Sequence, residues 1–135
     1  ASQEIMSCLK DNPKLGHITT FGGHPVIASA GLATITELNT SNLIEETLQK
    51  EKLIRTHLNH PEIKEIRGKG LMLAAIVETP EIASEIILKC LDKGLLLFWL
   101  LFEGKAIRIT PPLTISDDEV IKGCKTLIEV IEEVI

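Results

Sequence analysis

The stretch Leu71-Met72-Leu73-Ala74-Ala75-Ile76-Val77-Glu78-Thr79-Pro80 contains the clearest structural signals in the chain. Residues 71–77 are all apolar and have the length of a strand. Thr79-Pro80 is typical of a helix start, because proline suits the first helical turn. Another short strand is predicted just upstream, at 63–67, and Gly68-Lys69-Gly70 separates the two. This order predicts two adjacent strands followed by a helix.

The residues after this helix predict two further strands. Gly94 is expected to end the helix, because glycine is favoured just beyond a helical C-terminus. Strands are then expected at 95–102 and 105–110, around a turn at Glu103-Gly104. Pro111-Pro112 ends the second of these strands, since proline cannot donate to a sheet ladder.

Helices are predicted on both sides of the strand region. The last helix begins at Ser116, whose hydroxyl can accept from the backbone N–H near Glu119. The predicted order is β-β-α-β-β-α, which favours an α+β fold with a small, largely antiparallel sheet covered on one face by helices. Upstream, three helices are expected: 3–9, 25–38, and one beginning after Asn42, where Asn42 and Glu45 resemble a capping box.

Composition narrows the class of protein. A chain of 135 residues suits one domain, and a net charge of -5 with three arginines and no basic cluster argues against nucleic-acid binding. The longest apolar run, 95–102, is too short to span a membrane. Cys8, Cys90 and Cys124 are an odd and widely spaced set, which favours free thiols in a reducing cytoplasm. The four histidines have no metal-ligand spacing, so we expect no metal site.

The glycine- and threonine-rich segment 16–25 has the composition of an anion-binding loop. Its glycines allow backbone N–H groups to approach a ligand closely, and its threonine hydroxyls can donate hydrogen bonds. The helix start at Pro25 adds partial positive charge, which favours a group such as phosphate. A plain tight turn entering a close-packed helix explains the same residues, and the segment alone does not separate the two interpretations.

Arg108 is the strongest single candidate for a ligand-binding residue. Side chains alternate along a strand, so Ile107 and Ile109 are expected to face the helix-covered core and Arg108 the opposite face. A guanidinium there, just before a rigid Pro111-Pro112, can hold a carboxylate through two parallel hydrogen bonds. A solvated arginine on an open sheet face is the alternative.

Three segments considered together resemble a known family: Thr19–Pro25, 66–72 and 107–113. In this order they are similar to the C-terminal part of class III pyridoxal-phosphate-dependent aminotransferases, the acetylornithine, ornithine and 4-aminobutyrate aminotransferase family. The resemblance implies a fold-type I homodimer, in which each subunit has a large cofactor domain and a C-terminal small domain. It further implies that 1–23 is the tail of the large domain, 24–38 a connecting helix and 39–135 the small domain.

The resemblance also implies roles for individual residues. Thr20 matches the threonine that donates to the cofactor phosphate of the neighbouring subunit, and Phe21 and Gly22 match positions of the same cofactor-binding loop. Arg108 matches the arginine that binds the substrate carboxylate.

The resemblance gives other positions of these segments no direct role in binding. Some match a structural turn, and one differs from the residue that many family members have. Arg67, Gly68 and Gly70 match a turn between strands that we interpret as structural. His24 stands where many family members have asparagine, which affects how the loop is positioned.

The resemblance implies an enzyme that transfers an amino group from an amino acid or ω-amine to a 2-oxo acid. The Schiff-base lysine of such enzymes belongs upstream of this chain, so no catalytic residue is assigned here and the chain alone is expected to be inactive. The alternatives are a non-catalytic α+β small-molecule-binding or regulatory domain and a purely structural interaction domain.

Overall fold

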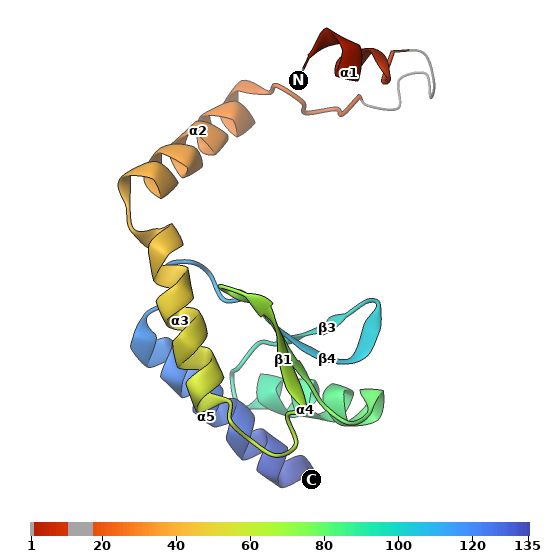
Figure 1. Ribbon diagram of the computed structural model, residues 1–135, viewed down its shortest axis with the longest axis vertical. Coiled ribbons are helices and arrows are strands. Elements are labelled where there is room, and N and C mark those ends of the chain that lie inside the picture. The colour runs from red at the N-terminus through yellow and green to blue at the C-terminus, as the bar shows by residue number, and fades with distance from the viewer. Residues whose placement is uncertain (1, 11–17) are drawn as a thin grey trace. The chain divides into compact units, whose positions relative to one another are not determined.

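The computed structural model describes residues 2–10 and 18–135 of the chain (Figure 1). Gly16 and His17, which the sequence interpretation included in the anion-binding loop, lie outside the described residues. The chain divides into two compact units, 1–40 and 41–135, and each is described by itself.

The first unit contains two helices, α1 (Gln3–Ser7) and α2 (Pro25–Thr40). The Ser2 side chain accepts from the backbone N–H of Ile5 and so caps α1. α2 begins at Pro25, as the sequence predicts, and carries small side chains at positions 28–31 and 33. Neither helix buries a residue within the described part of the chain.

The second unit confirms the predicted α+β class. Its sheet has the order β1-β2-β4-β3, and every neighbouring pair is antiparallel. The helices pack on one face of this sheet, and Figure 1 shows α3 running beside α5. The elements are α3 (Leu43–His57), β1 (Glu65–Lys69), β2 (Met72–Ile76), α4 (Pro80–Asp92), β3 (Phe98–Leu100), β4 (Glu103–Ile109) and α5 (Asp117–Val134).

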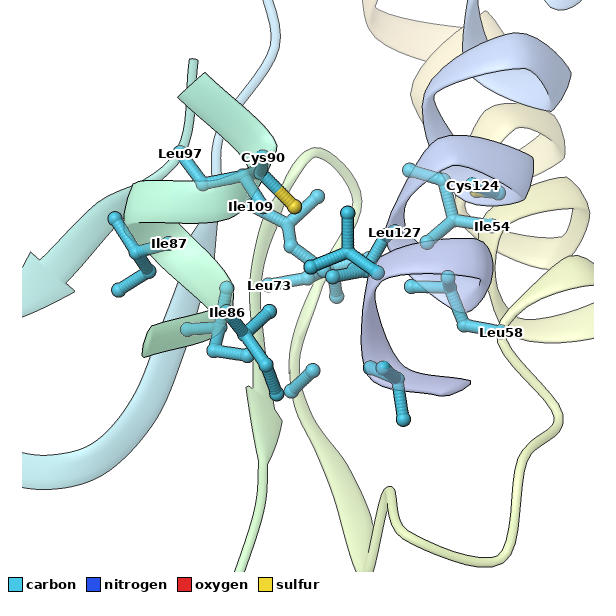
Figure 2. Close-up of a cluster of buried hydrophobic side chains, with 14 of the residues drawn as sticks. Ile54, Leu58, Leu73, Ile86, Ile87, Cys90, Leu97, Ile109, Cys124 and Leu127 are labelled. Carbon is cyan, nitrogen blue, oxygen red and sulfur yellow. The ribbon is translucent and has the colours of Figure 1, made fainter. Parts of the chain in front are cut away.

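One apolar core joins the helices to the sheet (Figure 2). Leu73 and Ile109 contribute from the central strands, and Cys90 of α4 and Cys124 of α5 are buried, free thiols. Burial raises the pKa of both thiols to about 11, so they stay protonated at neutral pH and pack as small apolar groups. Cys8, by contrast, is exposed.

Helices α4 and α5 begin where the sequence predicts, after the capping residues Thr79 and Ser116. The Thr79 hydroxyl accepts from Ile82 at the start of α4. Ser116 and Glu119 form a complete capping box at the start of α5, in which each side chain accepts from the other's backbone N–H. Among the described residues, no helix is both long and apolar enough to cross a membrane.

Three local predictions are wrong. Gly68 and Lys69, predicted to lie between the strands, belong to β1, where they pair with Leu73 and Met72. Asn42 precedes α3 but its side chain makes no capping hydrogen bond, because its backbone (φ -94°, ψ 14°) lacks the extended conformation of a capping residue. The hairpin between β3 and β4 turns at Leu101-Phe102, and the predicted turn residues Glu103 and Gly104 begin β4. An irregularity in the pairing beside Leu100 shifts the register and moves the turn upstream.

Two side chains of α3, Glu51 and Arg55, hold the β1–β2 hairpin, and we call this pair the clamp. The Glu51 carboxylate accepts from the Gly70 backbone N–H (2.6 Å) and from Arg55 Nε (2.9 Å). The other guanidinium nitrogens of Arg55 donate to the carbonyls of Ile66 (2.6 Å) and Gly68 (2.9 Å). One charged pair on a helix therefore binds three backbone groups of the hairpin.

Gly68 is required by the hairpin backbone. It has φ +108°, and a Cβ placed on it would lie 2.0 Å from the Met72 carbonyl oxygen. We expect Gly68→Ala to lower the free energy of unfolding by more than about 2 kcal/mol. Gly94 has φ +80°, but an added Cβ would meet open space. Gly94→Ala should therefore lower the free energy of unfolding by only about 1 kcal/mol. Urea titrations of the purified variants measure both.

Gly123→Ala in α5 is the matched control, because the added Cβ would make an ordinary 3.5 Å contact with Leu95. It should raise the stability by up to about 1 kcal/mol, since alanine favours the helix. Equal losses for Gly68→Ala and Gly94→Ala would contradict the predicted clash with Met72.

The clamp also predicts a pH dependence of stability. The Gly70 backbone N–H, followed by Arg55, holds the pKa of the Glu51 carboxyl below its ordinary value of 4.5. A lowered pKa in the folded state stabilises the fold above the unfolded-state pKa, and this contribution is lost as the pH falls through the folded-state value. We expect Glu51→Gln to lose less stability than the wild type below about pH 4.5. Urea titrations at several acidic pH values measure this, and Glu132→Gln on exposed α5 surface should follow the wild type.

Candidate functional site

Arg108 lies on the face of the sheet opposite the helices, as the sequence predicts. Its neighbours in β4, Ile107 and Ile109, are buried in the helix-covered core, whereas Arg108 is exposed. The alternation of side chains along β4 produces this difference. We call this side of the sheet the open face; it carries Ala74, Phe98 and Arg108.

The residues opposite Arg108 on the two adjacent strands differ greatly in size. Ala74 of β2 pairs with it on one side, and Phe98 of β3 pairs with it on the other. The central carbon of the guanidinium lies over the Phe98 ring, 5.0 Å from its centroid. This distance is within the range of a cation–π interaction. Arg108 thus has an aromatic neighbour on its β3 side and a methyl group on its β2 side.

Arg67 lies in the same cross-strand row but is electrostatically different. Its guanidinium pairs with Glu65 (2.8 Å) and Glu103 (3.5 Å), and the hydrogen bond to Glu65 is the main reason that its pKa is raised. Arg108 makes no ion pair with a carboxylate of the described residues. Arg108 therefore has its charge free to attract an anion, whereas the charge of Arg67 is already compensated.

The ion pair between Arg67 and Glu103 extends over β2, because β1 and β4 flank that strand. Beneath this region is a second apolar cluster of Ala74, Ile76 and Ala106, with Leu100 packed against it. One end of the open face is consequently closed by side chains of the sheet itself. Arg108 borders this cluster, because it pairs with Ala74, and its own side chain is exposed.

A mostly apolar cavity of about 260 Å³ borders Arg108 and Phe98. It extends between the β3 and β4 region and helices α3 and α5. Cys124 is among its lining residues, and the raised pKa of its thiol, a result of burial, makes it a poor nucleophile. Glu119 also lines this cavity, which lies on the helix-covered side of β4, whereas the Arg108 side chain is on the open face.

The glycine–threonine loop forms a tight turn in the first unit. The Gly22 N–H donates to the Thr19 carbonyl (3.3 Å), and a Cβ on Gly22 would lie 2.5 Å from the Thr19 hydroxyl oxygen. Gly23 has φ +77°, a conformation that side-chain-bearing residues rarely adopt. The Thr20 hydroxyl makes no hydrogen bond to any residue that the structure describes. The turn therefore presents an exposed, unused hydroxyl at the start of α2.

His24 takes the place of a polar capping residue for α2. Its Nδ1 accepts from the Val26 backbone N–H at 3.3 Å, as the side-chain oxygen of a capping asparagine does. The Phe21 ring contacts the His24 ring edge to face, with centroids 6.1 Å apart. His24 thus makes a hydrogen bond to the helix start of the kind that a capping side chain makes.

The predicted site residues fall into two groups. Thr20, Phe21 and Gly22 lie together in the turn of the first unit, and Arg108 lies on the sheet of the second. Sequence reasoning missed Phe98, which it placed within a long strand, because only the β3–β4 register identifies the residue opposite Arg108.

Comparison with known proteins gives the family. The family model for class-III aminotransferases matches residues 1–131. Among curated relatives, the acetylornithine aminotransferase of Caldanaerobacter subterraneus is 37% identical over 123 residues, which is 87% of this chain and 30% of that protein. The putrescine aminotransferase of Pectobacterium atrosepticum is 34% identical over 139 aligned positions, covering 98% of this chain and 30% of that protein.

Solved structures agree with this assignment. An aminotransferase of Bacillus anthracis has a TM-score of 0.81 at 25% identity and covers 98% of this chain and 34% of its own. The ornithine aminotransferase of Toxoplasma gondii has a TM-score of 0.78 at 27% identity, with coverage of 97% and 32%. This chain spans about a third of the length of these proteins. The match of the family model over nearly all its residues shows that the chain belongs to the class-III aminotransferase family.

Proposed function

We propose that this chain is the C-terminal part of a pyridoxal-phosphate-dependent transaminase and supplies its substrate-carboxylate anchor. The observation that carries the proposal is Arg108, an exposed guanidinium without a carboxylate partner among the described residues. It occupies the position of the carboxylate-binding arginine that the family resemblance implies. A planar guanidinium binds a carboxylate through two parallel hydrogen bonds, which fixes both the position and the orientation of a substrate.

The turn at Thr20 fits a contact to the cofactor phosphate. Its hydroxyl has no partner within the described residues, and Gly22 and Gly23 bring the backbone into a compact turn at a helix start. Hydroxyl and backbone N–H groups of this kind are suitable donors to a phosphate oxygen. When bound, pyridoxal phosphate acts as an electron sink for the carbon that carries the amino group.

The remaining parts of the proposal follow from the family. We infer that residues 1–23 belong to a large cofactor domain, 24–38 to a connecting helix and 39–135 to a small domain. The Thr20 turn contributes to the cofactor site of the partner in a homodimer. The free, buried thiols Cys90 and Cys124 support a cytoplasmic location.

The proposed substrates are an amino donor of the acetylornithine, ornithine or 4-aminobutyrate type and a 2-oxo acid acceptor. The names of the relatives, acetylornithine and putrescine aminotransferase, support this range of donors. The Schiff-base lysine is assigned to the rest of the enzyme, so the chain alone is inactive in this proposal.

The carboxylate anchor is tested by Arg108→Lys in the full-length enzyme. Lysine keeps the charge but loses the fork of parallel donors, so the KM for the 2-oxo acid should rise about tenfold or more. Steady-state kinetics with varied 2-oxo acid measure this change. Arg67→Lys is the matched control, because Arg67 is held by Glu65 and Glu103 and should leave the KM unchanged. An unaltered KM in Arg108→Lys would contradict the assignment.

The phosphate contact is tested by Thr20→Val, which keeps the side-chain shape and removes the hydroxyl. A lost hydrogen bond to a charged group should raise the dissociation constant of pyridoxal phosphate about tenfold or more. Equilibrium dialysis of the full-length enzyme measures it. Thr20→Ser retains the hydroxyl and should bind the cofactor nearly as the wild type does. Equal affinities for the valine and serine variants would show that the hydroxyl makes no such contact.

A further inference from the structure

We propose that Phe98 is a positioning residue that holds the Arg108 guanidinium ready for the substrate carboxylate. The proposal rests on the carboxylate-binding role assigned to Arg108 above. It is carried by the cross-strand register, which places the two residues directly opposite each other, and by the 5.0 Å separation of guanidinium and ring centroid.

The advantage of an aromatic neighbour is that it does not compete with the substrate. A carboxylate partner would occupy the N–H donors, as Glu65 does for Arg67 at 2.8 Å. An aromatic ring beside a guanidinium attracts its charge without competing as a carboxylate does, so the N–H groups stay available to a substrate carboxylate. Phe98 can therefore restrict Arg108 without neutralising its charge.

Holding the side chain in advance strengthens binding. An exposed arginine has many rotamers, and restricting them on binding costs free energy. The interaction with Phe98 lowers that cost, because part of the restriction is present before the substrate arrives. Ala74, on the other side of Arg108, makes no comparable contact because its side chain is a single methyl group.

The ring of Phe98 is itself supported. β3 is an edge strand of three residues, and Trp99 fixes it to α4 by donating from Nε1 to the Ser84 hydroxyl at 2.9 Å. The rings of Phe98 and Trp99 meet edge to face, with centroids 5.6 Å apart. A chain of contacts thus leads from helix α4 through Trp99 and Phe98 to Arg108.

The hairpin also offers a matched control residue. Phe102 lies at the tip of the same hairpin, is fully exposed (101%), and has no cation–π contact with an arginine of the described residues. Phe98→Leu and Phe102→Leu therefore remove the same aromatic ring from the same hairpin, and only the first removes it from beside Arg108.

The experiment measures carboxylate binding by the full-length protein in two ways. Calorimetry of the cofactor-free protein gives the dissociation constant of succinate, an unreactive dicarboxylate. Steady-state kinetics of the loaded enzyme separate KM for the 2-oxo acid from kcat. In Phe98→Leu, we expect about three- to tenfold weaker succinate binding and a similar rise in KM, with kcat nearly unchanged.

The other variants give the controls. Phe98→Tyr keeps an aromatic face and should bind succinate within about twofold of the wild type. Phe102→Leu should bind succinate as the wild type does. Thermal unfolding monitored by circular dichroism establishes that each variant is folded, and recovery in Phe98→Tyr separates loss of the ring from general damage to the hairpin.

The outcomes distinguish this inference from the function on which it rests. If Arg108→Lys leaves succinate binding and KM unchanged, the carboxylate-anchor function itself is overturned. If Arg108→Lys weakens binding but Phe98→Leu does not, only the role of Phe98 is overturned. Equal losses in Phe98→Leu and Phe98→Tyr, or in Phe98→Leu and Phe102→Leu, would also overturn it.

Discussion

The antiparallel pairing of β2 with β4 is the interaction on which the sheet and the candidate site depend. It sets Leu73 opposite Ile109 and Ala75 opposite Ile107 on the helix-covered face, and Ala74 opposite Arg108 on the open face. A slip of one residue would exchange the two faces of the strand, bury the guanidinium and expose the isoleucines. The apolar core therefore determines which side of the sheet carries the Arg108 guanidinium.

The two arginines of the open face differ in their partners, and the partners determine whether the guanidinium donors are already occupied. Arg67 is bound to two carboxylates, and together with Glu103 it helps to close one end of the face over a small apolar cluster. Arg108 is bordered by a ring and a methyl group, so its donors stay available. The clamp from Glu51 and Arg55 secures the hairpin that carries Arg67.

The features that were predicted correctly from the sequence depend on residues that are close together along the chain. The capping box of Ser116 and Glu119 spans a single helical turn, and the outward direction of Arg108 follows from alternation along one strand. The failures have local causes that composition does not reveal. Asn42 has the residue type of a cap without the backbone conformation, and an irregular pairing moved the hairpin turn to Leu101-Phe102.

The sequence by itself determined the α+β class, the order of the elements and the exposure of Arg108, because hydrophobic periodicity and helix caps act over a few residues. Only the tertiary structure decided which side chains meet across strands. The Phe98 ring beside Arg108 and the carboxylates on Arg67 both depend on strand register, which arises from pairings between distant parts of the chain. The same is true of the clamp from Arg55, whose partners lie in a different element and were not visible in any motif.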